Sequence, residues 1–129
     1  MKIKGIERVA LQVQDIEVSV ERFSRLLGTS FQRHDLQIGE AVTKLAFSPL
    51  GIELLEDPSS EQEFLRSFHL RVENIDEVRR SVKEAGGQVL SQICVGSMEH
   101  VITQFGAFRI VFVCYSGQEA LQALAGSDI

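Results

Sequence analysis

One sequence pattern occurs twice in this chain, and this internal repeat constrains the fold more than any other feature. Residues 11–17, LQVQDIE, are echoed by residues 70–76, LRVENID, at an offset of 59. At the same offset, Phe23 of the first copy corresponds to Val82 of the second. A period of this length with only two copies is not that of a solenoid or a repeat array. The repeat therefore predicts a domain built from two paired modules.

In each copy an alternating apolar stretch leads into a helical pattern. Residues 7–14 alternate apolar and polar side chains, which is typical of a half-buried strand. After Asp15, the expected N-cap, apolar residues recur at helical spacing until Gly28 ends the pattern. The second copy repeats both features, with Asn74 as its cap. The main elements predicted in this way are strands over residues 6–14 and 67–73 and helices over residues 16–27 and 75–86.

Shorter strands are predicted after each helix, where turn residues separate alternating runs. They lie over residues 30–37, 40–47, 51–55, 88–95, 98–105 and 107–115. Residues 61–66 are expected to form one helical turn, and residues 118–124 a short amphipathic helix. The chain is thus predicted to be a single α+β domain, 1–129. Its two βαβββ modules, about 4–56 and about 67–115, would form an eight-stranded cleft.

Composition excludes several classes of protein. The 129 residues carry a formal net charge of −5 and no basic run, so we expect no nucleic-acid partner. The apolar runs are too short to cross a bilayer, so we expect no membrane partner either. The first residues, MKIKG, lack the apolar core of a signal peptide, which favours a cytoplasmic location.

Several segments in order resemble the vicinal oxygen chelate superfamily. They are residues 6–13 (IERVALQV), 26–28 (LLG), 51–56 (GIELLE), 72–77 (VENIDE) and 108–113 (FRIVFV). This superfamily includes glyoxalase I, extradiol dioxygenases, methylmalonyl-CoA epimerase, fosfomycin-modifying enzymes and bleomycin resistance proteins. The resemblance covers about residues 4–115 and implies the glyoxalase/bleomycin resistance-like fold and a homodimer. It fixes no reaction, because the superfamily spans many chemistries and simple binders.

The resemblance also implies where a metal would bind, at one position on the first and last strand of each module. In this chain those positions hold Arg8, Glu53, Ser67 and Val111. A guanidinium has no lone pair to give a metal, and valine has no donor atom. His69 is two residues beyond Ser67, a displacement of about 7 Å along a strand. We therefore predict no metal and no cofactor at this place.

Strand alternation predicts which polar side chains line the cleft. The predicted ligand-binding residues are Arg8, Glu53, His69, Arg71 and Arg109. We expect Arg8 and Glu53 to form a direct ion pair, because a buried guanidinium needs a carboxylate. This pair either closes the cleft as a structural contact or takes part in binding. The ligand would be a small molecule that is anionic or carries a carbonyl group.

Three functions remain open at this point. The leading hypothesis is a metal-free small-molecule-binding protein of the glyoxalase/bleomycin-resistance type, with the ligand in the concave cleft. The alternative is a metal-dependent lyase, isomerase (epimerase) or ring-cleaving dioxygenase whose site has shifted to Glu53 and His69. A second alternative is a non-catalytic interaction module. No catalytic residue is assigned, and His34 and His100 match no zinc motif and are expected at the surface or rim.

Overall fold

The computed structural model describes residues 1–117, 120 and 123. Eight strands are hydrogen-bonded in the order β2-β3-β4-β1-β5-β8-β7-β6. This confirms the predicted α+β fold of two βαβββ modules, while most of the helix expected over residues 118–124 lies outside the described residues. The elements are β1 (Ile3–Gln12), α1 (Ile16–Leu27), β2 (Gln32–Ile38), β3 (Ala41–Ser48), β4 (Ile52–Glu56), β5 (Phe64–Val72), the 3₁₀ turn η1 (Ile75–Glu77), α2 (Val78–Glu84), β6 (Gln88–Val95), β7 (Met98–Phe105) and β8 (Phe108–Cys114).

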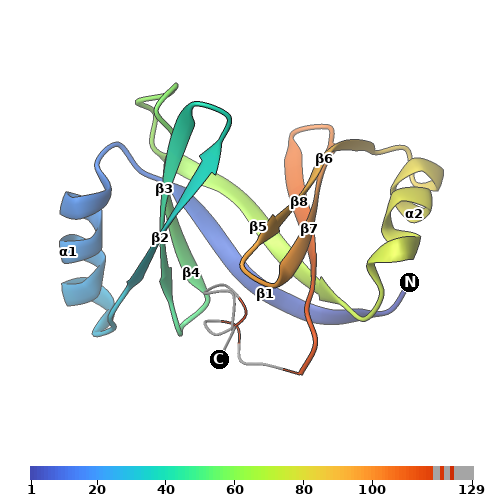
Figure 1. Cartoon of the computed structure of the whole chain (residues 1–129), viewed down its shortest axis with the longest axis horizontal. Helices are drawn as coiled ribbons and strands as arrows, with labels where there is room; N and C mark the ends of the chain where they lie inside the picture. Colours follow the sequence, from blue (N-terminus) through green and yellow to red (C-terminus); the bar gives the residue numbers. More distant parts are fainter. Residues whose placement is uncertain (118–119, 121–122, 124–129) are drawn as a thin grey trace. The chain divides into compact units, whose positions relative to one another are not determined.

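The chain divides into two compact units with the same internal topology. We call Arg8–Arg66 module one, and Met1–Glu7 together with Ser67–Ile129 module two. In module one, β1 pairs in parallel with β4, and β2, β3 and β4 follow one another as antiparallel neighbours (Figure 1). In module two, β5 pairs in parallel with β8, and β6, β7 and β8 are antiparallel. The sequence repeat therefore corresponds to a repeat of sheet topology.

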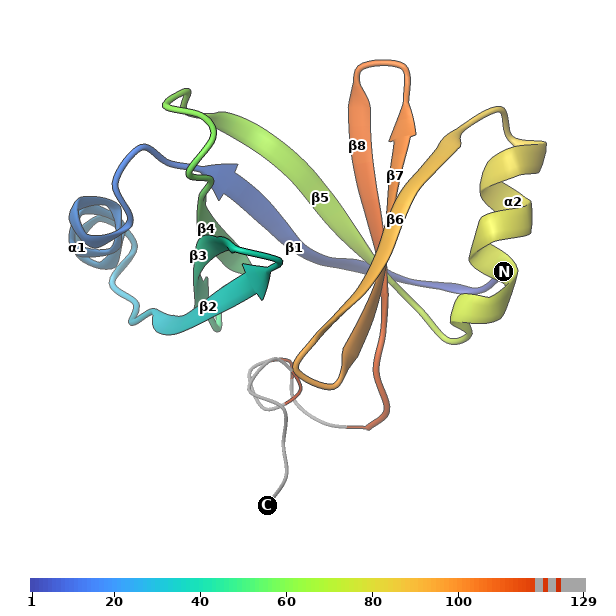
Figure 2. The same cartoon turned by 45° about the horizontal axis from the view of Figure 1, so that its top comes forward.

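In module one, α1 covers one face of the sheet, as Figures 1 and 2 show from two sides. The Asp15 carboxylate accepts hydrogen bonds from the first helical amides, and Gly28 ends the helix in the left-handed conformation with φ 63°. Ile16 is fully buried against Ala46 and Leu54. The predicted helix over residues 16–27 is confirmed because cap, apolar stripe and stop signal agree.

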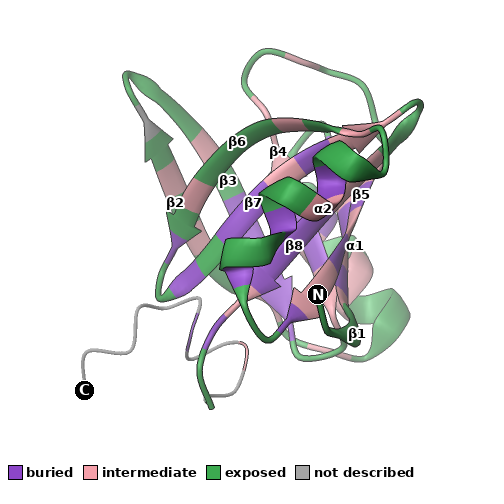
Figure 3. Cartoon of the chain, turned by 90° about the vertical axis from the view of Figure 1, so that its right-hand side faces the viewer, coloured by how far each residue is buried: buried purple, intermediate pink, exposed green. Residues whose placement is uncertain are grey.

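In module two the corresponding helix is shorter than the predicted 75–86. It begins as the 3₁₀ turn η1 after Asn74, and α2 itself has only seven residues. Position 87, just after this helix, requires glycine, because a Cβ there would lie only 2.5 Å from the Phe105 ring. The buried side of α2 packs on the sheet through Val78 and Val82, and its outward side is exposed (Figure 3).

The connector between the modules differs from the sequence prediction. Residues 61–66 form no helical turn: residues 61–63 lie in no helix or strand, and β5 already begins at Phe64. Contacts with the end of β1 hold the connector in this conformation. The Glu63 carboxylate accepts from the Gln14 amide at 2.9 Å, and the Gln12 side chain donates to the Gln62 carbonyl at 3.1 Å. These tertiary contacts outweigh the local helical propensity, because a segment of this length is too short to form a stable helix alone.

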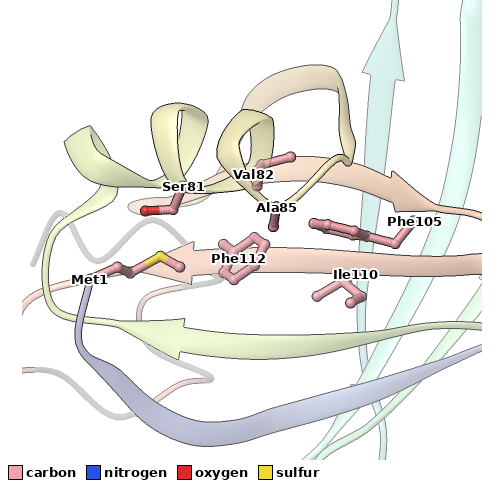
Figure 4. A pocket seen from close by; sticks show the side chains of 7 residues that line it. All are labelled: Met1, Ser81, Val82, Ala85, Phe105, Ile110 and Phe112. Atoms are coloured by element: carbon pink, nitrogen blue, oxygen red, sulfur yellow. The ribbon is translucent and has the colours of Figure 1, made fainter.

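An apolar pocket of about 240 Å³ lies between α2 and the sheet of module two (Figure 4). Its lining residues are Met1, Ser81, Val82, Ala85, Phe105, Ile110 and Phe112. At the position equivalent to Val82, module one carries Phe23, which packs against the core of that module. The smaller valine side chain therefore helps to explain why space remains beneath α2. No helix in the described part of the chain is long and apolar enough to cross a membrane.

Candidate functional site

Each module has one sheet face without a helix, and we call it the helix-free face. Directly paired residues of neighbouring strands point to the same side of a sheet, so the strand register identifies this face. In module one it includes Arg8, Ala10, Gln12, Leu45, Phe47, Glu53 and Leu55. In module two it includes Ser67, His69, Arg71, His100, Arg109, Val111 and Val113. All five sequence-predicted ligand-binding residues lie on these faces.

Arg8 and Glu53 form a buried ion pair on the helix-free face of module one. The Arg8 Nε donates to the Glu53 Oε1 at 2.6 Å, and each side chain is only 6% exposed. The guanidinium also lies over the Phe47 ring, 5.3 Å from its centroid. The predicted ion pair is therefore confirmed. A charge-assisted hydrogen bond of this kind compensates part of the cost of burying both charges.

A second group of hydrogen-bonded polar side chains links the helix-free face of module one to the connector. Gln12 is 2% exposed, and its amide oxygen accepts a hydrogen bond from Arg66. Arg66 in turn lies 3.6 Å from the Asp57 carboxylate. Hydrogen bonds from the Ser59 hydroxyl and amide, assisted by Arg66, lower the pKa of Asp57 below its usual 3.8. The sequence analysis did not single out these residues, whose roles depend on the path of the connector.

The strand register tests whether the superfamily's metal position could be filled here. His69 is the register partner of Val111, just as Ala10 is the partner of Glu53. Ser67 therefore corresponds to Arg8, and His69 is displaced from that position by two residues. Glu53 is engaged by a guanidinium, and the described residues contain no group of three or more His, Cys, Asp or Glu side chains that could hold an ion. The residues present do not fit a divalent metal at this position.

Two buried histidines meet on the helix-free face of module two. His69 is 5% exposed and His100 is 3% exposed, and their rings are 5.9 Å apart in an edge-to-face arrangement. The His100 Nδ1 lies 3.3 Å from the Met98 carbonyl oxygen. The expectation that His100 lies at the surface or rim was therefore wrong. Alternation within β7 turns its side chain away from α2 and toward His69, which the sequence alone did not reveal.

Arg71 lies next to this histidine pair and contacts Tyr115. Its guanidinium carbon is 3.7 Å from the centroid of the Tyr115 ring, and its Nη2 donates to the Tyr115 carbonyl at 3.2 Å. The Tyr115 hydroxyl donates to the Glu7 Oε1 at 2.7 Å. The Arg71 Nε is buried and has no hydrogen-bond partner among the residues that the structure describes. Tyr115 was missed by sequence reasoning, because it follows the last strand and matches no motif.

Arg109 lies at the opposite end of β8. The register pairs Arg71 with Val113, four residues from Arg109, which corresponds to about 13 Å along the strand. The Arg109 Nε donates to the Gln104 side-chain oxygen at 3.2 Å. The structure therefore places His69 and Arg71 with His100 at one end of the helix-free face, and Arg109 with Gln104 at the other.

Comparison with known proteins shows the fold. No family profile matches the sequence, and no curated protein matches it. Methylmalonyl-CoA epimerase from Mycobacterium tuberculosis is 15% identical, with a TM-score of 0.71 over 89% of this chain and 90% of that chain. A variant of the Streptomyces coelicolor epimerase in complex with 2-nitronate-propionyl-CoA is 13% identical, with a TM-score of 0.74 over 90% and 100%.

A third similar structure is a hypothetical protein from Bacillus halodurans C-125. It is 20% identical to this chain, with a TM-score of 0.72 over 92% of this chain and 98% of that chain. These likenesses extend over nearly the whole chain, and the two βαβββ modules account for them. The chain has the fold of the vicinal oxygen chelate superfamily.

Proposed function

We propose that this protein binds a small molecule without a metal ion, and that the ligand lies on the helix-free face of module two. The ligand is anionic or carries a carbonyl group. The buried Arg8–Glu53 pair is the observation that carries the metal-independent part of this proposal. A cation fixed at a metal-ligand position repels a divalent ion, and it competes with that ion for the carboxylate.

The basic side chains on the helix-free face of module two support an anionic or carbonyl-bearing ligand. Arg71 and Arg109 lie on its helix-free face together with the two histidines. Over the described strands β5 to β8, none of the residues on this face is a carboxylate. Placed hydrogen-bond donors among apolar residues such as Val111 and Val113 are typical of small-molecule sites.

The metal-dependent alternative has one argument in its favour. The structural neighbours include methylmalonyl-CoA epimerases, one of them in complex with 2-nitronate-propionyl-CoA. An acyl-CoA carries both a carbonyl and phosphate anions, so this ligand class belongs among the compounds to test. The donor set of this chain argues against the metal, because the Arg8 cation bonded to Glu53 would lie beside any ion that this carboxylate bound.

Calorimetric titration in a buffer with chelator tests the proposal. The compounds are short carboxylates, 2-oxo acids and acyl-CoA thioesters, each with a neutral amide analogue as control. We expect at least one class to bind with an affinity that chelator does not change. Binding or turnover that appears only after a divalent ion is added would instead support the lyase, isomerase or dioxygenase alternative. Absence of binding by every class would favour the interaction module.

We also propose that the protein is a homodimer. The strand order leaves β2 and β6 at the two ends of the sheet, and exposed strand edges favour pairing with another chain. Closed two-fold symmetry is the usual arrangement of soluble homo-oligomers. Light scattering over a range of protein concentrations tests this, and a monomeric mass at the highest concentration would contradict it.

A further inference from the structure

We infer that the Nε edge of Arg71 is a binding site for a planar carboxylate, and that Tyr115 is the residue that positions it. This inference rests on the proposed function and names the chemical group that the helix-free face of module two recognises. It assigns different roles to two contacting side chains. Arg71 touches the ligand, whereas Tyr115 acts through Arg71.

The first argument is the hydrogen bonding of the Arg71 guanidinium. Its Nη2 donates one hydrogen bond to the Tyr115 carbonyl, but its Nε is buried and has no acceptor in the described part of the chain. Buried donors are nearly always paired, and a buried donor without a partner requires an explanation. A bound oxyanion would supply the acceptor.

The second argument is charge. Arg71 forms no ion pair among the described residues, whereas Arg8 on the equivalent face of module one is paired with Glu53. Guanidinium Nε–H and Nη–H groups form a fork that matches the two oxygens of a carboxylate. His69 and His100 lie on the same sheet face as Arg71, and none of the residues on this face of the described strands β5 to β8 is a carboxylate. The geometry therefore favours a carboxylate over a neutral carbonyl.

The third argument is the way in which Tyr115 holds Arg71. The ring lies against the guanidinium, the backbone carbonyl accepts its Nη2, and the hydroxyl is itself fixed by Glu7. An arginine side chain has several rotatable bonds, so these contacts reduce the entropy lost when a ligand binds. They also fix the plane of the fork, on which bidentate recognition depends.

Malonate titration by calorimetry tests the role of Arg71, with malonamide as the neutral control. We expect malonate to bind and malonamide not to bind. Arg71→Lys keeps the charge but loses the fork, and we expect it to weaken malonate binding by about tenfold or more. The matched control is Arg80→Lys on the exposed side of α2, which should leave the affinity within about twofold.

Two further variants test the positioning role of Tyr115. Tyr115→Phe keeps the ring and the backbone carbonyl, so most of the affinity for malonate should remain. Tyr115→Leu removes the ring, and its loss of affinity should be larger for malonate than for inorganic phosphate, because a tetrahedral anion depends less on the plane of the fork. A residue with only a structural role would lower both affinities equally.

A measurement on the unmodified protein makes the test independent of the folding of any variant. The Arg71 Nε–H resonance, observed by ¹⁵N NMR, should shift strongly on addition of malonate. Malonate binding that Arg71→Lys leaves unchanged, without this shift, would overturn the carboxylate site and leave the proposed function standing. Absence of binding by every compound tested would overturn both.

Discussion

The two modules share one topology and one register, but their helix-free faces differ in charge. In module one Arg8 is paired with Glu53 within the same sheet, so the buried charges cancel. In module two the residues at the equivalent positions are Ser67 and Val111, and the basic side chains His69, Arg71 and Arg109 lie at other positions of the same two strands. The comparison shows that the repeat fixes where side chains point, whereas their identity decides whether a face is closed by its own ion pair or is suited to a ligand.

The helix-covered faces differ as well. α1 has 12 residues and packs Phe23 against its sheet, while α2 has seven and presents Val82 at the equivalent position. The pocket beneath α2 follows from this difference. Module two therefore retains space on its helix-covered face, beneath the shorter helix.

The largest expected effect comes from breaking the ion pair of module one. Arg8→Ala leaves the buried Glu53 without its bonded guanidinium, which should lower the free energy of unfolding by about 3–5 kcal/mol. The control is Arg25→Ala, which removes an ion pair between Arg25 and Glu21 at the surface. Because the Arg25 side chain is 82% exposed, this variant should lower the free energy of unfolding by less than about 1 kcal/mol. Urea unfolding measures both. A similar small loss in the two variants would show that the charges of module one are not effectively buried.

The next prediction compares how tightly α1 and α2 pack on their sheets, by exchanging the equivalent residues Phe23 and Val82. Val82→Phe should fill part of the pocket under α2 and raise the free energy of unfolding by about 0.5–2 kcal/mol. The reverse change in module one, Phe23→Val, removes packed volume and should lower it by about 1–2 kcal/mol. Thermal and urea unfolding test the pair. Destabilisation by Val82→Phe would mean that the pocket cannot accept a ring.

The smallest expected effect concerns Asp57 in the connector of module one. Its carboxyl pKa is lowered in the folded state, so it stabilises the fold above its ordinary pKa of 3.8. This contribution is lost as the pH falls through the lowered pKa of the folded protein. Asp57→Asn should therefore cost at most about 1 kcal/mol near neutral pH. The difference from the unmodified protein should fade in acid, and a difference independent of pH would contradict this assignment.

The elements with strong local signals could be predicted from the sequence. The cap Asp15, the apolar stripe and the terminal Gly28 specify α1, and period-two alternation placed Arg8 and Glu53 on one face. The connector over residues 61–66 could not be predicted, because its conformation depends on contacts with Gln12 and Gln14, which are distant in sequence.

The part of the candidate site that lies in module two could not be predicted in full, because it depends on contacts between strands that are remote in sequence. His69 and His100 meet across an intervening strand, so neither residue signals the other along the chain. Tyr115 lies 44 residues from Arg71, and its partner Glu7 is 108 residues away. Such contacts follow from sheet order and register, which local patterns specify only in part.

Titration of the chelator-stripped protein with Ni²⁺, Co²⁺ and Mn²⁺ tests the central claim most directly, namely that the Arg8–Glu53 pair takes the place of a metal site. We predict no stoichiometric metal binding at Glu53, and a ligand affinity that is the same with and without these ions. Calorimetry on the unmodified protein and on Glu53→Gln provides the measurement. One ion bound per chain, and lost in Glu53→Gln, would contradict the account.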